Sequence, residues 1–206
     1  LLLAHFNISK NEIKKKRVEK EMMWGICIGI VLGALLMNLA VEEENRINEI
    51  LKKVINNLEE DLKNEKPHYL VVSHLEPDHS ANIEKLVKKY PEIKIILSQR
   101  AATMLPQFTN KDLSDKLIIV KEAEKINLGK HTLQFFMAPM VHWPEVMVTY
   151  EKTEKILFSA DGFGKFGTLD TDEEWDCEAR RYYFNIVGKY GAQVQALLKK
   201  AATLDI

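Results

Sequence analysis

Short apolar runs alternate with amphipathic segments between residues 42 and 120, and this alternation restricts the fold more than any other feature of the chain. In Glu42–Lys63, apolar residues recur every three or four positions, which predicts an amphipathic helix covering a core. The continuous apolar run Tyr69–Val72 is bounded by turn residues and predicts a buried strand. The pattern indicates an α/β fold of layered sheets with helices outside.

Further helices and strands are expected along the rest of the chain. Ser80 is expected to cap a helix that ends before Pro91. The next expected elements are a strand at Ile93–Leu97, a helix at Gln99–Phe108 and a strand at Leu117–Val120. Two hairpins are expected next, one that pairs Lys125–Leu128 with His131–Met137 and one that pairs Val146–Tyr150 with Lys155–Ser159. Two helices follow them, at Asp172–Val187 and Lys189–Ala202.

The composition indicates which partners and which cellular compartment to expect. The 206 residues include 29 Lys and Arg against 30 Asp and Glu, so the net charge is −1. A chain with this balance has no overall basic field, and we expect no nucleic-acid partner. Cys27 and Cys177 cannot build a disulfide framework, which favours a reducing compartment such as the cytoplasm.

Residues 1–41 form an atypical N-terminal segment, in which a basic stretch is followed by an apolar one. The run Met22–Val41 carries no charge and is long enough to span a membrane, in which case it would anchor the protein. A pair of buried strands explains the same run equally well, because periodicity does not separate the two. Residues 42–206 are expected to form the main domain.

Four residues with metal-binding side chains follow the first predicted strand. Residues two apart in an extended segment point the same way, so His74, Glu76 and Asp78 can share a face. His79 stands at the start of the next helix, and Pro77 disfavours helix at Glu76. Imidazoles and carboxylates together are ligands typical of zinc or iron.

The motif His-x-Glu-x-Asp-His at residues 74–79 resembles the ligand motif of flavodiiron proteins, also called A-type flavoproteins. Two later segments resemble further ligand segments of that family: a Val-His-Trp-Pro-Glu segment containing His142, and a Ser-Ala-Asp-Gly-Phe-Gly segment containing Asp161. The resemblance covers roughly residues 66–206. It implies a metallo-β-lactamase-like fold, an αββα sandwich.

The resemblance also implies a non-haem centre of two irons. The ligands implied for one iron are His74, Glu76 and His142, those for the other are Asp78 and His79, and Asp161 would bridge the two. Such an oxidoreductase would reduce O₂ to water, NO to N₂O, or both. Its electrons would come from FMN on a flavodoxin-like domain, supplied by a rubredoxin-like donor, in a head-to-tail homodimer.

The chain departs from the family in three ways. The family's last His ligand lies further along than Ile206, no flavodoxin-like sequence is present, and the first 40 or so residues do not resemble the family's opening strands. The sequence therefore predicts an incomplete sandwich, truncated before that ligand. Two alternatives stay open: a zinc-dependent hydrolase of the same fold, in which a zinc-bound water attacks the substrate, and an inactive fragment.

Overall fold

The computed structural model describes residues 46, 48–49, 52–53, 55–63, 65–167 and 174–206. The chain divides into two units, residues 1–58 and 59–206, and the second contains both sheets. The described positions between 46 and 62 are helical, as the spacing of apolar residues predicts. The run Met22–Val41 lies outside the described residues, and among the helices that are described we find none that could span a membrane.

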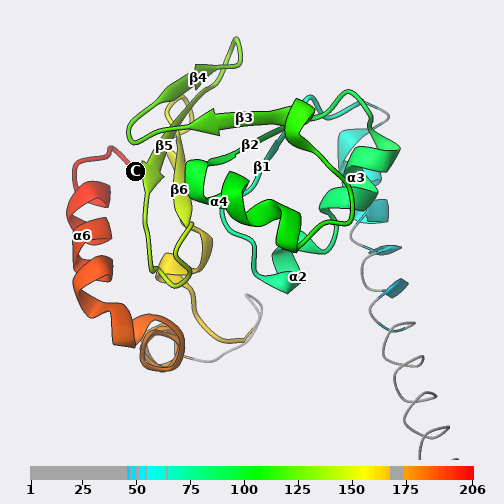
Figure 1. The fold of residues 1–206 in the computed structure, drawn as a ribbon. Coiled ribbons are helices and arrows are strands. Elements are labelled where there is room, and N and C mark those ends of the chain that lie inside the picture. The colour runs from blue at the N-terminus through cyan, green and yellow to red at the C-terminus, as the bar shows by residue number, and fades with distance from the viewer. Residues whose placement is uncertain (1–45, 47, 50–51, 54, 64, 168–173) are drawn as a thin grey trace, which may run out of the picture. The chain divides into compact units, whose positions relative to one another are not determined.

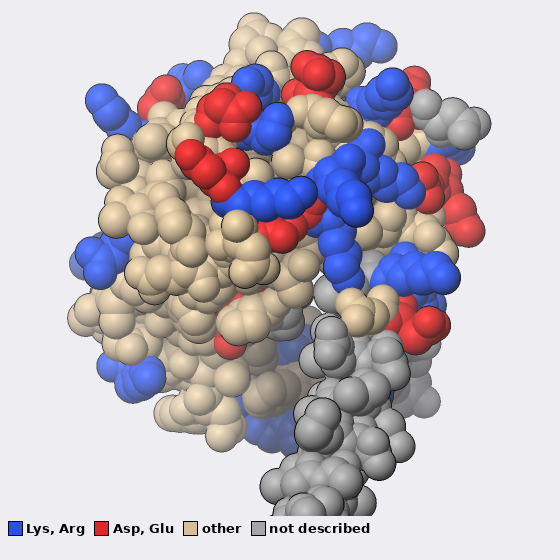
Figure 2. All heavy atoms as spheres, turned by 45° about the vertical axis from the view of Figure 1, so that its right-hand side comes forward, with Lys and Arg blue, Asp and Glu red and all other residues tan. Residues whose placement is uncertain are grey.

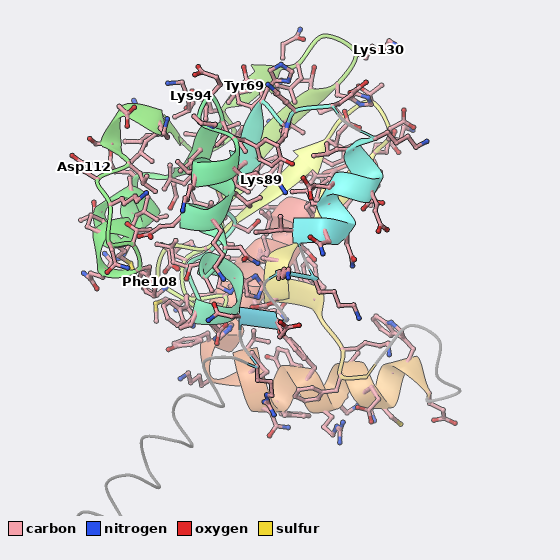
Figure 3. The ribbon with its side chains drawn as sticks, turned by 90° about the vertical axis from the view of Figure 1, so that its right-hand side faces the viewer. Tyr69, Lys89, Lys94, Phe108, Asp112 and Lys130 are labelled. Carbon is pink, nitrogen blue, oxygen red and sulfur yellow. The ribbon has the colours of Figure 1, made fainter. Side chains whose placement is uncertain are left out.

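Three parallel strands form the first sheet, in the order β1 (Tyr69–Val71), β2 (Lys94–Ser98), β3 (Leu117–Val120). Tyr69 pairs with Lys94, and Figure 3 shows the two residues close together at the start of their strands. The connections contain the helices α2 (Pro77–Ser80), α3 (Ile83–Lys89) and α4 (Gln99–Met104) and the 3₁₀ turns η1 (Leu105–Gln107) and η2 (Ser114–Lys116).

Strand β1 is half-buried rather than buried, which corrects the prediction from its apolar run. Tyr69 is 43% exposed, while Val72, just after the strand, is buried. The reason is the position of β1, which within the described part of the chain pairs only with β2 and therefore forms an edge of the sheet.

Four antiparallel strands form the second sheet, and they confirm both predicted hairpins. Their order is β4 (Lys125–Asn127), β5 (Thr132–Met137), β6 (Met147–Glu151), β7 (Ile156–Phe158). In the turn between β4 and β5, Gly129 has φ +90°, a backbone conformation that favours glycine.

The two sheets pack face to face with helices outside, which confirms the αββα arrangement (Figure 1). On β2, Ile95 and Leu97 pack toward α3 and α4, whereas Ile96 faces the second sheet. On β5, Phe135 meets Ile96 between the sheets, whereas Phe136 packs toward the C-terminal helices. Alternate residues of each strand therefore belong to different cores, as the pleat requires.

The C-terminal region is helical, as predicted, with irregular turns between its two helices. Its elements are α5 (Trp175–Tyr182), the π-turn η4 (Tyr183–Val187), the 3₁₀ turn η5 (Gly188–Tyr190) and α6 (Gly191–Ala201). Val194 and Leu197 of α6 are buried against the second sheet.

Charges of both signs share the molecular surface. On the face drawn in Figure 2, Lys and Arg side chains lie among those of Asp and Glu. Lys89 pairs with Glu59, and Lys116 lies 3.8 Å from Asp115. This mixture follows from the near-equal numbers of acidic and basic residues.

The helix start predicted at Ser80 is wrong. Ser80 is the last residue of the short helix α2, and α3 begins only after Asn82. Pro77 occupies the first position of α2, where its fixed φ favours a helix start and its missing N–H leaves no hydrogen bond unmade. Asp78 therefore lies on a helical turn with His79 and not on the extended segment that carries His74.

Candidate metal centre

The segment that carries His74 is anchored to both sheets. The amide of Val72 donates to the carbonyl of Ile96 at 2.9 Å, and the amide of Met147 donates to the carbonyl of Ser73 at 2.9 Å. His74 follows at once and is only 2% exposed. Backbone hydrogen bonds to β2 and β6 therefore fix the main chain from which this imidazole projects.

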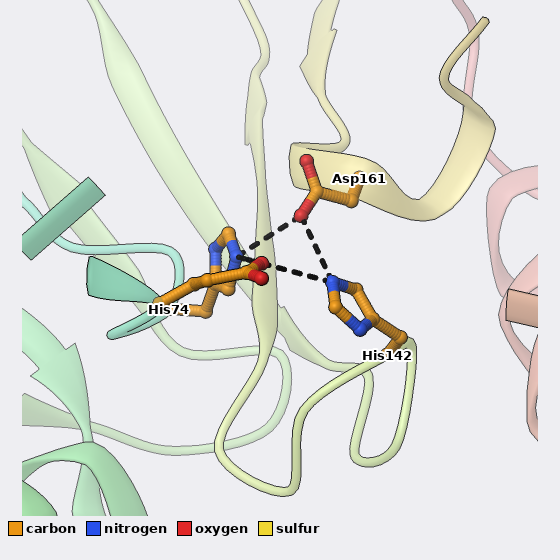
Figure 4. A group of neighbouring side chains, drawn as sticks. His74, His142 and Asp161 are labelled. Atoms are coloured by element: carbon orange, nitrogen blue, oxygen red, sulfur yellow. Dashed lines mark hydrogen bonds and ion pairs between the residues drawn. The ribbon is translucent and has the colours of Figure 1, made fainter. Parts of the chain in front are cut away.

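Two loops of the second sheet bring the other side chains. His142 lies in the connection from β5 to β6, which is closed by a hydrogen bond from the amide of Ala138 to the carbonyl of Val146 at 2.8 Å. Asp161 lies in the 3₁₀ turn η3 (Ala160–Phe163), directly after β7. Both loops lie at the same end of the second sheet, beside the segment that carries His74 (Figure 4).

Four side chains from these three segments converge on one point. The Nε2 atom of His74 lies 3.0 Å from Asp161 Oδ2 and 3.4 Å from Glu76 Oε2. The Nε2 atom of His142 lies 3.0 Å from Glu76 Oε2 and 3.4 Å from Asp161 Oδ2. Figure 4 shows the imidazoles of His74 and His142 both directed at the carboxylate of Asp161.

These contacts shift the ionisation of His74 and Asp161. Burial works against the protonated imidazole of His74, but hydrogen bonds and attraction from Asp161 and Glu76 outweigh it and raise its pKa. The hydrogen bond from His74 lowers the pKa of Asp161, and the charges of His79 and His142 act in the same direction. The pocket therefore favours a positive charge between two carboxylates.

The geometry fits a metal ion at this point. Two ligand atoms that each lie about 2.1 Å from one metal ion are about 3.0 Å apart when the ligand–metal–ligand angle is a right angle. They are about 3.4 Å apart when that angle is tetrahedral. The four contacts measure 3.0–3.4 Å, and one atom from each side chain lies within 4.8 Å of the others. Two imidazoles and two carboxylates form a donor set suited to iron or zinc.

The structure thus brings together four of the six residues singled out in the sequence: His74, Glu76, His142 and Asp161. The ring of His79 lies beside that of His74, with 4.2 Å between centroids, although His79 is itself exposed. Asp78 is placed on α2, and its side chain lies outside the described part of the structure.

Glu145 belongs to the same site, although sequence reasoning assigned it no role of its own. It is 2% exposed, and its Oε1 accepts a hydrogen bond from the amide of Leu75, 2.9 Å away, between His74 and Glu76. The signal that could have found it was a carboxylate directly before the apolar run of β6. Such a residue is costly to bury without a partner.

Comparisons with known proteins agree with this geometry. Residues 46–188 match the family model described as ODP family beta lactamase. A nitric oxide reductase of Moorella thermoacetica is 33% identical over 146 residues, which cover 67% of this chain and 36% of the relative.

Two solved structures resemble the fold. A mutant form of the flavo di-iron protein of Thermotoga maritima gives a TM-score of 0.66 at 27% identity, covering 77% of this chain and 41% of the other. Rubredoxin oxygen:oxidoreductase of Desulfovibrio gigas gives a TM-score of 0.60 at 32% identity, covering 66% of this chain and 35% of the other. In eight curated relatives the matched part of this chain spans between 24% and 36% of the relative's length.

Proposed function

Because the chain belongs to the ODP β-lactamase family and is a relative of the flavodiiron proteins, we propose that it is the metal-binding domain of an O₂ or NO reductase. One observation carries the proposal: His74, Glu76, His142 and Asp161 converge from three separate segments. Two relatives, a nitric oxide reductase and a rubredoxin oxygen:oxidoreductase, support the same type of reaction.

The proposed cofactor is a pair of irons. The ligands proposed for the first iron are His74, Glu76 and His142, those for the second are Asp78 and His79, and Asp161 would be shared. A shared carboxylate reduces the repulsion between two cations. The irons, when bound, would supply the electrons and the open positions that O₂ or NO needs.

The protein's own part is to hold the ligands and to leave one side accessible. The side chain of His74 is fully buried, whereas that of Glu76 is 32% exposed, so the centre opens toward Glu76. Trp143 packs its ring against Phe108, with 6.0 Å between centroids, which fixes the loop that carries His142.

The same proposal extends to partners and location. Electrons would come from FMN on a flavodoxin-like domain. A rubredoxin-like protein would supply them to the FMN, and the name of the D. gigas relative supports this donor. We further propose a head-to-tail homodimer in the cytoplasm, with residues 1–41 as an N-terminal segment that precedes the di-iron domain; an anchor to the membrane through residues 22–41 is the alternative.

Metal analysis of the purified full chain tests the proposal. After iron supplementation we expect close to two irons per chain in the wild type. His142→Ala and Asp161→Asn should each retain less than one iron per chain, because the first removes an imidazole of the converging set and the second replaces its carboxylate by a neutral amide. His68→Ala, which changes an exposed histidine outside the centre, should retain the wild-type content.

Two outcomes would contradict the di-iron proposal. Less than one metal per chain in the wild type would favour the inactive fragment. Retention of zinc in preference to iron, with chelator-sensitive hydrolysis of a chromogenic ester, would favour the zinc hydrolase.

A further inference from the structure

Glu145 is a buried carboxylate that the proposed metal ligands do not include. It is 2% exposed and precedes β6 in the chain. Within the described structure its Oε2 has no hydrogen-bond partner, while its Oε1 accepts from the amide of Leu75. Burial of a half-satisfied carboxylate costs free energy, so an explanation by stability alone is poor.

The bond to Leu75 acts on the segment that presents His74 and Glu76. Leu75 is 0% exposed, and its amide lies between these two residues, so the bond fixes the backbone from which both side chains project. The residues joined are 70 positions apart in the chain. Glu145 thereby ties the ligand segment after β1 to the loop that carries His142.

Glu145 is itself held in place by the first sheet. Ser98, the last residue of β2, donates its hydroxyl to the carbonyl of Glu145 at 2.8 Å and accepts from the amide of Ala101 at 3.1 Å. Ser98 is 3% exposed. The start of α4, the loop before β6 and the ligand segment thus form one continuous hydrogen-bonded chain.

We propose that Glu145 is a positioning residue, which through its hydrogen bond to the amide of Leu75 sets the distance between the metal-binding atoms of His74 and Glu76. The inference rests on the proposed function, because it assigns a role toward the same metal site. Residues that orient metal ligands typically change affinity by about 10- to 100-fold when removed.

The test compares two buried glutamates at opposite ends of β6. Glu145→Ala and Glu151→Ala each remove a carboxylate that accepts hydrogen bonds from backbone amides. The donors to Glu151 are the amides of Thr132, Thr153 and Glu154, none of which lies in the ligand segment. Co²⁺ is titrated into the metal-free full chain, and binding is followed by its visible absorption. Urea unfolding of each metal-free variant measures the loss of stability separately.

We expect Glu145→Ala to bind Co²⁺ about 10- to 100-fold more weakly, with an altered absorption band. Glu151→Ala should bind Co²⁺ with the affinity of the wild type, even if it lowers the free energy of unfolding as much as Glu145→Ala does. Glu145→Gln keeps an oxygen that accepts from Leu75 and should restore both affinity and band. Should Glu145→Ala fail to fold, Glu145→Asp, which draws the carboxylate back from Leu75, should show the same weakened binding.

The outcomes separate the two proposals. Failure of the wild type to bind Co²⁺ would overturn the proposed function. Binding by the wild type with equal affinities in the Glu145 and Glu151 variants would overturn only the positioning role. Equal losses in Glu145→Gln and Glu145→Ala would also overturn it, because the acceptor oxygen would then not be the feature that matters.

Discussion

At the scale of single residues, backbone amides stabilise a second buried carboxylate far more fully than Glu145. Glu151 accepts from the amides of Thr132 at 3.2 Å, Thr153 at 3.0 Å and Glu154 at 2.5 Å. Burial alone would raise its pKa, but these donors outweigh burial and lower the pKa to about 2. The carboxylate thus closes the turn between β6 and β7.

The low pKa of Glu151 predicts a specific loss of stability in acid. Its folded-state pKa is below its ordinary value of 4.5, so its contribution is complete above pH 4.5 and is lost as the pH falls toward about 2. Glu151→Gln should therefore give a shallower fall in the free energy of unfolding between these pH values, measured by urea unfolding at a series of pH values. Parallel curves for variant and wild type would refute the assignment.

At the scale of elements, the pleat assigns each strand residue to one of the packed layers. Phe135 of β5 is 0% exposed and lies between the sheets with Ile96 and Met147. Phe158 of β7 is 54% exposed. The same residue type therefore occupies the interior and the surface of one sheet.

This pair of phenylalanines gives a matched test of the sandwich. Phe135→Ala should lower the free energy of unfolding by about 3–5 kcal/mol, because it leaves a cavity between the sheets. Phe158→Ala should change it by about 0.5 kcal/mol or less, as exposed substitutions usually do. Equal losses in urea unfolding would contradict the packing of β5 against the first sheet.

Local patterns predicted the elements well and the contacts between them poorly. The apolar run of β3 ends at charged residues, so its bounds, Leu117–Val120, agree with the prediction. The helix expected before Pro91 is present as α3, but its predicted start at Ser80 was wrong because Pro77 starts a separate turn three residues earlier. The convergence of His74 with Asp161 followed from resemblance to a family, since no local rule brings together residues so distant in the chain.

The role of Glu145 could not be predicted for the same physical reason. Its bond to Leu75 spans 70 residues and depends on how the two sheets are stacked. Periodicity reports which face of an element is buried, but not which polar atom meets it from another layer.

At the scale of the whole molecule, the candidate metal centre draws its side chains from both sheets of the sandwich. His74 and Glu76 follow β1 of the first sheet, whereas His142 and Asp161 extend from loops of the second. A cation held by all four would connect segments that otherwise depend on side-chain packing between the sheets. Because the unfolded chain does not hold these groups together, binding free energy becomes folding free energy.

Metal binding should therefore raise the melting temperature of the full chain. At a free Co²⁺ concentration 100 times the dissociation constant, the stabilisation is about 2.7 kcal/mol. For a chain of this size that corresponds to a rise of about 5 to 10 °C. Differential scanning calorimetry should show this rise, and EDTA should reverse it. Asp161→Asn, which removes a carboxylate that contacts both imidazoles, should show little or no rise. An unchanged melting temperature at Co²⁺ concentrations that saturate the wild type would mean that the ion binds the unfolded chain as tightly as the folded one, and so does not depend on a site that the fold assembles.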